Sequence, residues 1–193
     1  MQGLITLALA AGAAALPAST SKPPISNMEF GLIMDVSTTD SPIYVSLNGV
    51  KNGTSEDLIL IGERLSVYPG TPTYLDLVSA DPDYQALNFD VDGCKYGLYA
   101  QDIGDNYGIK TYVTAKKDEE QYAWSVYNGE VRHRLYAATN QFLACNTTYN
   151  GETYLALGWG IADSMGKYPE GCQATRVFQN CNIEGSEAKC ETA

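Results

Sequence analysis

The most restrictive feature of this sequence is a period-two alternation of apolar and polar residues that recurs between short turn signals. The clearest segments are 87–91 and 155–161, in each of which every second residue is large and apolar. Successive side chains of a β-strand point to opposite faces of a sheet, so this pattern predicts strands with one face in a core. Alternation over 43–47 and 111–115 predicts two more strands, and the continuous apolar run 58–61 predicts a strand buried on both faces.

Turn signals separate these segments. Asn-Gly occurs four times, at positions 48–49, 52–53, 128–129 and 150–151. Both central residues of a type I′ hairpin turn have positive φ, which Asn and Gly tolerate best, so each pair predicts a turn. The clearest hairpin spans residues 122–136 with Asn128-Gly129 at its tip, and it would place Trp124 and His133 on one face.

No segment beyond the N-terminus shows the apolar period of an amphipathic helix, and Gly or Pro recurs at short intervals through the middle of the sequence. Many short strands with such spacing predict an all-β fold, either an antiparallel sandwich or a small barrel, with a trefoil-like barrel as one form. At 193 residues the chain has the length of one domain, and we expect a single all-β domain over residues 30–181.

An apolar, alanine-rich run at residues 3–15 ends in small residues and is too short to span a bilayer. It predicts a signal peptide over residues 1–18, and cleavage after Ala15 or after Ala18 fits equally well. The alternative, a buried N-terminal helix, is disfavoured because Pro17 and later prolines would isolate it from the domain.

Two polar segments flank the predicted domain. Residues 19–29, in a stretch rich in Ser, Thr and Pro, predict a flexible arm. Residues 182–193 predict a polar tail. No apolar run of spanning length follows the leader, so a membrane span is not expected.

Two glycosylation acceptors, Asn52 in Asn-Gly-Thr and Asn146 in Asn-Thr-Thr, lie in turn-like sequence. Behind a signal peptide they predict a secreted, N-glycosylated protein. The five cysteines should mostly form disulfides in that compartment, with one left free or intermolecular, and their spacing leaves the pairing open. No C-x-x-C pair occurs, so neither a metal site nor a cofactor is expected.

The charge balance argues against nucleic acid as a partner. Acidic residues outnumber basic ones 23 to 12, and the net charge is −11. The basic residues are scattered, whereas a protein that follows a phosphate backbone presents a basic stripe.

Signals for catalysis are weak. The sole histidine, His133, lies between Arg132 and Arg134 in a strand-like segment, which favours a core-edge or surface role over that of a general base. Paired carboxylates could hydrolyse glycosides, and acidic residues are plentiful, but their abundance makes any one pair unspecific. Those considered are Asp76, Asp81, Asp83, Asp90, Asp92, Asp102 and Asp105. The segment 90–93 resembles the start of a calcium loop, although a turn after a strand explains it better.

Tyrosine is unusually frequent, with 14 Tyr against 4 Phe. Its ring is apolar and its tip polar, so it suits both half-exposed sheet positions and the aromatic surfaces that bind sugars. The simpler interpretation is that the tyrosines fill sheet positions. Candidate glycan contacts are Tyr96, Tyr99, Tyr107 and Tyr112, with Asp102 and Asp105 close by in sequence.

Three places in the chain resemble the PhiA-type cell-wall proteins of filamentous fungi. They are 30–33 with 41–45, 124–126 with 143–146, and 159–162 with 171–177. Asn146 stands where that family has proline, Cys190 is an addition, and 97–117 matches only loosely. The resemblance implies a non-enzymatic wall or surface protein tied to the development of spore-bearing cells. It also implies a disulfide between Cys145 and Cys172, and it supplies no catalytic residue.

These observations order three hypotheses. The first is a secreted, N-glycosylated, all-β protein of a fungal cell wall or surface, with a structural or developmental role and no enzymatic activity. The second is a secreted carbohydrate-binding module or effector, whose partner would be a cell-wall polysaccharide. The third is a small acidic glycoside hydrolase.

Overall fold

The computed structural model describes residues 30–37, 43–51, 53, 55–64, 70–76, 81, 84–101, 103, 108, 110–134 and 141–180. The predicted signal peptide at 1–18, the arm at 19–29 and the tail at 182–193 lie outside these residues.

Antiparallel β-strands build the described part of the chain, which contains no helix. The strands are β1 (Gly31–Asp35), β2 (Tyr44–Lys51), β3 (Leu58–Arg64), β4 (Thr73–Asp76), β5 (Ala86–Val91), β6 (Cys94–Tyr99), β7 (Lys110–Tyr112), β8 (Thr114–Lys117), β9 (Trp124–Tyr127), β10 (Glu130–His133), β11 (Gln141–Tyr149), β12 (Glu152–Gly160), β13 (Cys172–Ala174) and β14 (Val177–Asn180). The predicted all-β fold class is confirmed.

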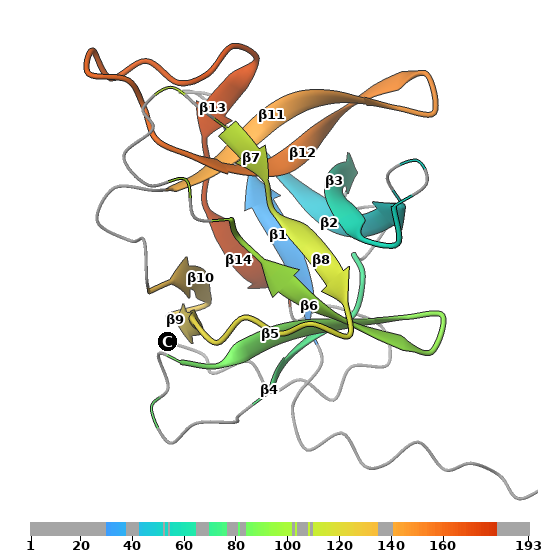
Figure 1. Cartoon of the computed structure of the whole chain (residues 1–193). Helices are drawn as coiled ribbons and strands as arrows, with labels where there is room; N and C mark the ends of the chain where they lie inside the picture. The colour runs from blue at the N-terminus through green and yellow to red at the C-terminus, as the bar shows by residue number, and fades with distance from the viewer. Residues whose placement is uncertain are drawn as a thin grey trace, which may run out of the picture.

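The main path of the sheet runs β4-β5-β6-β8-β3-β2-β1-β14-β10-β9 and then curls back on itself (Figure 1). Gln85, just before β5, exchanges two backbone hydrogen bonds of 3.0 Å with Trp124 of β9. Phe30, just before β1, and Thr73 of β4 exchange another pair of 2.8 Å. These bridges make the sheet a nearly closed barrel, the second of the two predicted architectures.

The strands β7, β11, β12 and β13 branch from this barrel at β3, and the β11–β12 hairpin extends across its upper end in Figure 1. One edge of β3 pairs with β2, while the other pairs first with β8 through residues 58–59 and then with β12 through 61–62. Gly62 lies at this fork, where an added Cβ would be 2.7 Å from Cγ2 of Val45. A side chain at position 62 would therefore force Val45 of β2 to shift.

The strands predicted at 87–91, 155–161 and 58–61 are present as β5, β12 and β3, and residues 58–61 are all buried, as expected for a strand covered on both faces. The single strand predicted at 111–115 is wrong in one respect, because it divides at Val113 into β7 and β8. The division marks a change of pairing partner, because β7 pairs with β12 whereas β8 pairs with β3 and β6. At this point the Val113 amide donates to the carbonyl of Leu157 at 3.1 Å.

Two of the Asn-Gly turns are confirmed by positive φ at both residues. The angles are 50° and 76° at Asn128-Gly129, and 50° and 82° at Asn150-Gly151. Asp92-Gly93 has the same geometry, with φ of 51° and 75° between β5 and β6, so segment 90–93 is the end of β5 followed by a hairpin turn. Asn52 lies outside the described residues, and Gly53 has a φ of 62°.

The turn predicted at Asn48-Gly49 is wrong, because both residues lie inside β2. They pair there with Ile61 and Leu60 of β3. A Cβ at Gly49 would lie 3.0 Å from Cδ1 of Leu58, so this glycine allows close packing. Pairing along the whole of β3 outweighs the local turn preference of two residues.

The two faces of β3 contact separate apolar clusters. Leu58 and Leu60 belong to the main core inside the barrel, which also holds both tryptophans. On the opposite face lies a smaller group that we call the outer cluster. It consists of Ile59, Ile61 and Ala156 and the partly buried Val50, Tyr112, Tyr149 and Tyr154. Tyrosine rings thus cover the apolar surface where the side branch leaves the barrel.

Candidate functional site

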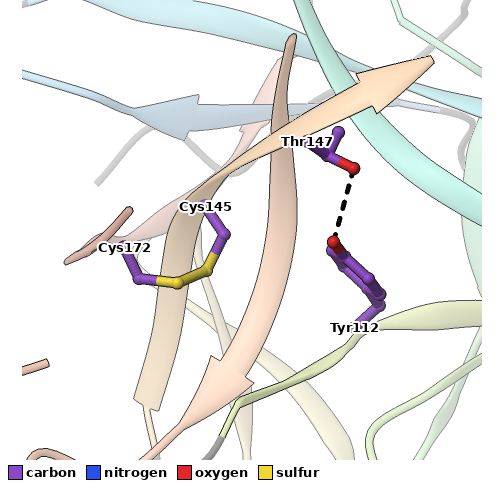
Figure 2. Close-up of a disulfide and its surroundings, with 4 residues drawn as sticks. All are labelled: Tyr112, Cys145, Thr147 and Cys172. Atoms are coloured by element: carbon purple, nitrogen blue, oxygen red, sulfur yellow. Dashed lines mark hydrogen bonds between the residues drawn. A yellow bond between two sulfur atoms is a disulfide. The ribbon is translucent and has the colours of Figure 1, made fainter. Parts of the chain in front are cut away.

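Strand β11 carries two residues that the sequence analysis singled out, a disulfide cysteine and a glycosylation acceptor. Cys145 of β11 and Cys172 of β13 are directly opposed in the sheet, with 4.0 Å between their Cα atoms, and form a disulfide (Figure 2). The bond joins residues 27 positions apart, and Cys145 is fully buried. The pairing implied by the family resemblance is therefore present. Cys94 holds a free thiol, while Cys181 and Cys190 lie outside the described residues.

The next residue along β11 is the predicted glycosylation acceptor Asn146, whose side chain is exposed. Its backbone amide donates to the carbonyl of Gly171 at 2.8 Å, which extends the pairing between β11 and β13. Thr148, the third residue of the acceptor sequence, is also exposed. The geometry leaves this acceptor open to solvent, whereas the other predicted acceptor, Asn52, lies outside the described residues.

Thr147, between these two residues, contacts the outer cluster. Its Oγ1 lies 3.3 Å from the hydroxyl of Tyr112 on β7 (Figure 2). Tyr149 and Tyr154 meet edge to face beside it, with 6.2 Å between ring centroids. Sequence reasoning singled out Tyr112 and missed these two, although their positions on either side of the Asn150-Gly151 turn were a usable signal, since short hairpins bring such residues together.

Of the four tyrosines predicted to contact glycan, the three that the structure describes do not form one surface. Tyr96 is only 5% exposed and packs in the main core, so its assignment as a glycan contact is wrong. The ring of Tyr99 on β6 is covered by Lys116, whose Nζ lies 3.9 Å from the ring centroid. Tyr112 lies on β7, which does not pair with β6. Tyr107 lies outside the described residues, as do Asp102 and Asp105.

His133 lies in the core and not at its edge. It is 2% exposed, and its ring is 4.5 Å from that of Trp124 and 5.3 Å from that of Trp159, centroid to centroid. Burial lowers its pKa to about 4, so the imidazole is neutral at neutral pH. Nε2 lies 3.1 Å from Oε1 of Gln121, an amide oxygen that also accepts from the Ala100 amide at 2.9 Å. A general base must reach the proton that it abstracts from the substrate, and a side chain enclosed in the core is not placed to do so. This environment therefore suits a packing role.

Two carboxylates meet on the outside of the barrel, where Lys95 lies between them. Its Nζ forms an ion pair of 3.1 Å with Asp76 and another with Glu120. Partial burial opposes the ionisation of Glu120, but hydrogen bonds from Lys95 and Tyr122 outweigh it and hold the pKa of Glu120 below its usual range. A glycosidase acid needs a raised pKa to donate its proton, so this pair gives no support to the hydrolase hypothesis.

A surface hollow of about 850 Å³ lies beside the disulfide and Asn146. It is lined by Gly108, Asp163, Gly166, Lys167, Tyr168, Pro169, Glu170, Gly171 and Cys172. Most of these residues belong to the connection between β12 and β13. Residues 163–170 of this connection form no recognisable motif, so the sequence carries no signal for the hollow.

Within the described residues, no three His, Cys, Asp or Glu side chains gather in a way that could hold a metal ion. The same part of the chain has no helix long and apolar enough to cross a membrane. Comparison of the chain with protein-family models, with curated proteins and with solved structures finds no match.

Proposed function

We propose that the protein is a secreted, N-glycosylated wall or surface protein of a fungus, with a structural rather than a catalytic role. The observation that carries the proposal is on β11, where a disulfide and an exposed glycosylation acceptor occupy adjacent positions, Cys145 and Asn146. Disulfides persist in oxidising compartments, and N-glycans are added to accessible Asn-x-Thr sequences of secreted proteins.

Two further observations support a structural role. The imidazole of His133 is enclosed by tryptophans, and Lys95 neutralises the carboxylates that face it. The resemblance to PhiA-type wall proteins, which implied the Cys145–Cys172 bond, points the same way.

The test is fractionation of a filamentous fungus that expresses the tagged chain from its own leader. We expect the protein in washed walls, released by glucanase or by reductant, and shifted in mass by an N-glycosidase. A cytosolic marker and a freely secreted enzyme serve as controls for lysis and for incomplete washing. Recovery from the medium alone, with none in washed walls, would contradict the wall assignment.

A second candidate function, binding of a wall polysaccharide, is favoured by the tyrosines of the outer cluster. Tyr112, Tyr149 and Tyr154 present partly buried rings on one side of the β11–β12 hairpin. Aromatic rings with polar tips provide packing surfaces for the C–H faces of sugars.

A pull-down across chitin, β-1,3-glucan, mannan and cellulose tests this candidate. Saturable binding to one polymer that weakens in Tyr154→Ala would support it. Tyr127→Ala is the matched control, because Tyr127 is a 58% exposed tyrosine on the distant strand β9. Equal loss in both variants, or no binding by the wild-type protein, would exclude the outer cluster as the site.

A further inference from the structure

The hollow beside Asn146 has a position that suits a covalently attached occupant. Asn146 neighbours Gly171, since a Cβ placed on Gly171 would be 3.6 Å from Cβ and 3.8 Å from Nδ2 of Asn146. Gly171 also lines the hollow. Nδ2 is the atom that a sugar would be joined to, so the first residues of a glycan would begin at the edge of the hollow.

Position 171, the lining residue next to Asn146, carries no side chain. Gly171 has a φ of 72°, a conformation that residues with a Cβ rarely adopt, and it is exposed. A Cβ at position 171 would touch the Asn146 side chain at ordinary van der Waals distance. Glycine leaves this space free for a sugar on Nδ2.

The lining offers both kinds of contact that a sugar uses. Tyr168 and Pro169 are partly buried and supply apolar ring faces, while Lys167 and Glu170 are exposed and can hydrogen-bond hydroxyl groups. Tyr168 is held in place, because its hydroxyl accepts a hydrogen bond of 2.7 Å from Nε2 of Gln141 on β11.

The loop that forms one wall of the hollow is organised by Asp163. Its Oδ1 accepts from the amides of Met165 at 2.9 Å and Lys167 at 2.8 Å. Its backbone amide donates to the carbonyl of Lys167 at 2.8 Å. A wall ordered before the ligand arrives loses little conformational entropy on contact, which favours binding even by weak interactions.

We infer that the N-linked glycan of Asn146 lies in this hollow, with its first sugars packed on Tyr168 and Pro169 across the β12–β13 connection. The inference rests on the N-glycosylation in the proposed function and adds where the glycan lies and which residues hold it. The glycan would then act as a cover for residues 163–172, and would not extend freely into solvent.

The test compares secreted, purified protein with and without the acceptor. Thr148→Ala removes the acceptor and keeps Asn146, whereas Thr147→Ala changes the neighbouring threonine and leaves Asn-x-Thr intact. Intact mass and glycopeptide mapping report occupancy at Asn146. Amide hydrogen exchange over 163–172 and the rate of tryptic cleavage after the exposed Lys167 report the cover.

We expect the wild type and Thr147→Ala to be glycosylated at Asn146 and to be cleaved after Lys167 severalfold more slowly than Thr148→Ala. Exchange at the distant Asn128-Gly129 turn should be equal in all three. Combined with Tyr168→Phe, which keeps the ring, Thr148→Ala should still speed cleavage after Lys167. Combined with Tyr168→Ala, which removes the ring but keeps the acceptor, Thr148→Ala should make no difference to the cleavage rate.

An occupied Asn146 with equal exchange and cleavage in the wild type and Thr148→Ala would overturn the inference while leaving the secreted glycoprotein intact. An unoccupied Asn146 would overturn it too, and wall retention, measured separately by fractionation, would then show whether the proposed function survives.

Discussion

The imidazole of His133 packs against the indole of Trp124 nearly at right angles, with ring centroids 4.5 Å apart and an interplanar angle of 78°. The two residues are directly opposed in the β9–β10 hairpin. Trp124 also bridges to Gln85 and thereby helps to close the barrel. The only histidine of the chain is thus part of the contact that joins the two ends of the sheet.

Burial of His133 predicts a specific loss of stability in acid. Its pKa is lowered by desolvation to about 4 in the folded protein, from an ordinary value of about 6.5 when unfolded. The unfolded chain therefore takes up a proton first, so the stabilising contribution is complete above pH 6.5 and is lost as the pH falls toward 4. Between pH 7.5 and 5 the loss should be about 2 kcal/mol.

Urea unfolding of the wild type and of His133→Gln at these two pH values measures this loss. The carboxylates are common to both proteins, so the difference between their pH dependences isolates the histidine. Equal pH dependence in the two proteins would mean that His133 titrates normally and is not buried as described.

The two tryptophans should differ in what their N–H groups contribute. Both rings are buried, and replacing either with Ala should cost about 3–5 kcal/mol. Nε1 of Trp124 donates to the carbonyl of Leu98 at 3.0 Å, whereas Nε1 of Trp159 has no acceptor among the described residues. Trp124→Phe should therefore be about 1 kcal/mol more destabilising than Trp159→Phe, because only the former leaves a carbonyl without its donor. Chemical denaturation of both variants checks the order, and the reverse order would contradict it.

Gly97 should tolerate no side chain. A Cβ there would lie 2.0 Å from the carbonyl oxygen of Glu119, which is backbone and has little freedom to move. Gly97→Ala should destabilise the protein by about 3 kcal/mol or more, or prevent folding. Gly93→Ala is the matched control, since Gly93 has positive φ but nothing within 4 Å of an added Cβ. It should cost only about 1–2 kcal/mol from backbone strain. Thermal melts in which Gly97→Ala has a melting temperature equal to or higher than that of Gly93→Ala would contradict the close approach of Gly97 to the Glu119 carbonyl.

Removing the disulfide should destabilise the protein through the unfolded chain. The bond closes a loop of 27 residues, for which the entropy model predicts about 3–4 kcal/mol. The double variant Cys145→Ser/Cys172→Ser should lose about this much in urea unfolding, and reductant should change its midpoint less than that of the wild type. Cys94→Ser, which alters a free thiol, should respond to reductant as the wild type does. An unchanged midpoint in the double variant would exclude the bond as a stabilising element.

Much of the fold could be predicted because its signals are local. Alternation over 87–91 and 155–161 identified two strands, and the Asn128-Gly129 hairpin placed Trp124 opposite His133, as observed. The candidate site could be predicted only in part. The acceptor Asn146 was recognisable because its motif consists of adjacent residues, whereas the hollow forms only when the fold brings residues 163–172 beside β11.

Alternation and turn chemistry in the sequence by themselves determined that the chain forms antiparallel strands, and they placed the hairpins at Asn128-Gly129 and Asn150-Gly151, because side-chain period and positive φ are properties of neighbouring residues. Only the tertiary structure decided that Asn48-Gly49 runs straight through β2, that Tyr96 is buried, and that the strand divides at Val113. Each of these outcomes depends on pairing and packing between residues far apart in the chain. Such contacts outweigh local preferences of about 1 kcal/mol per residue.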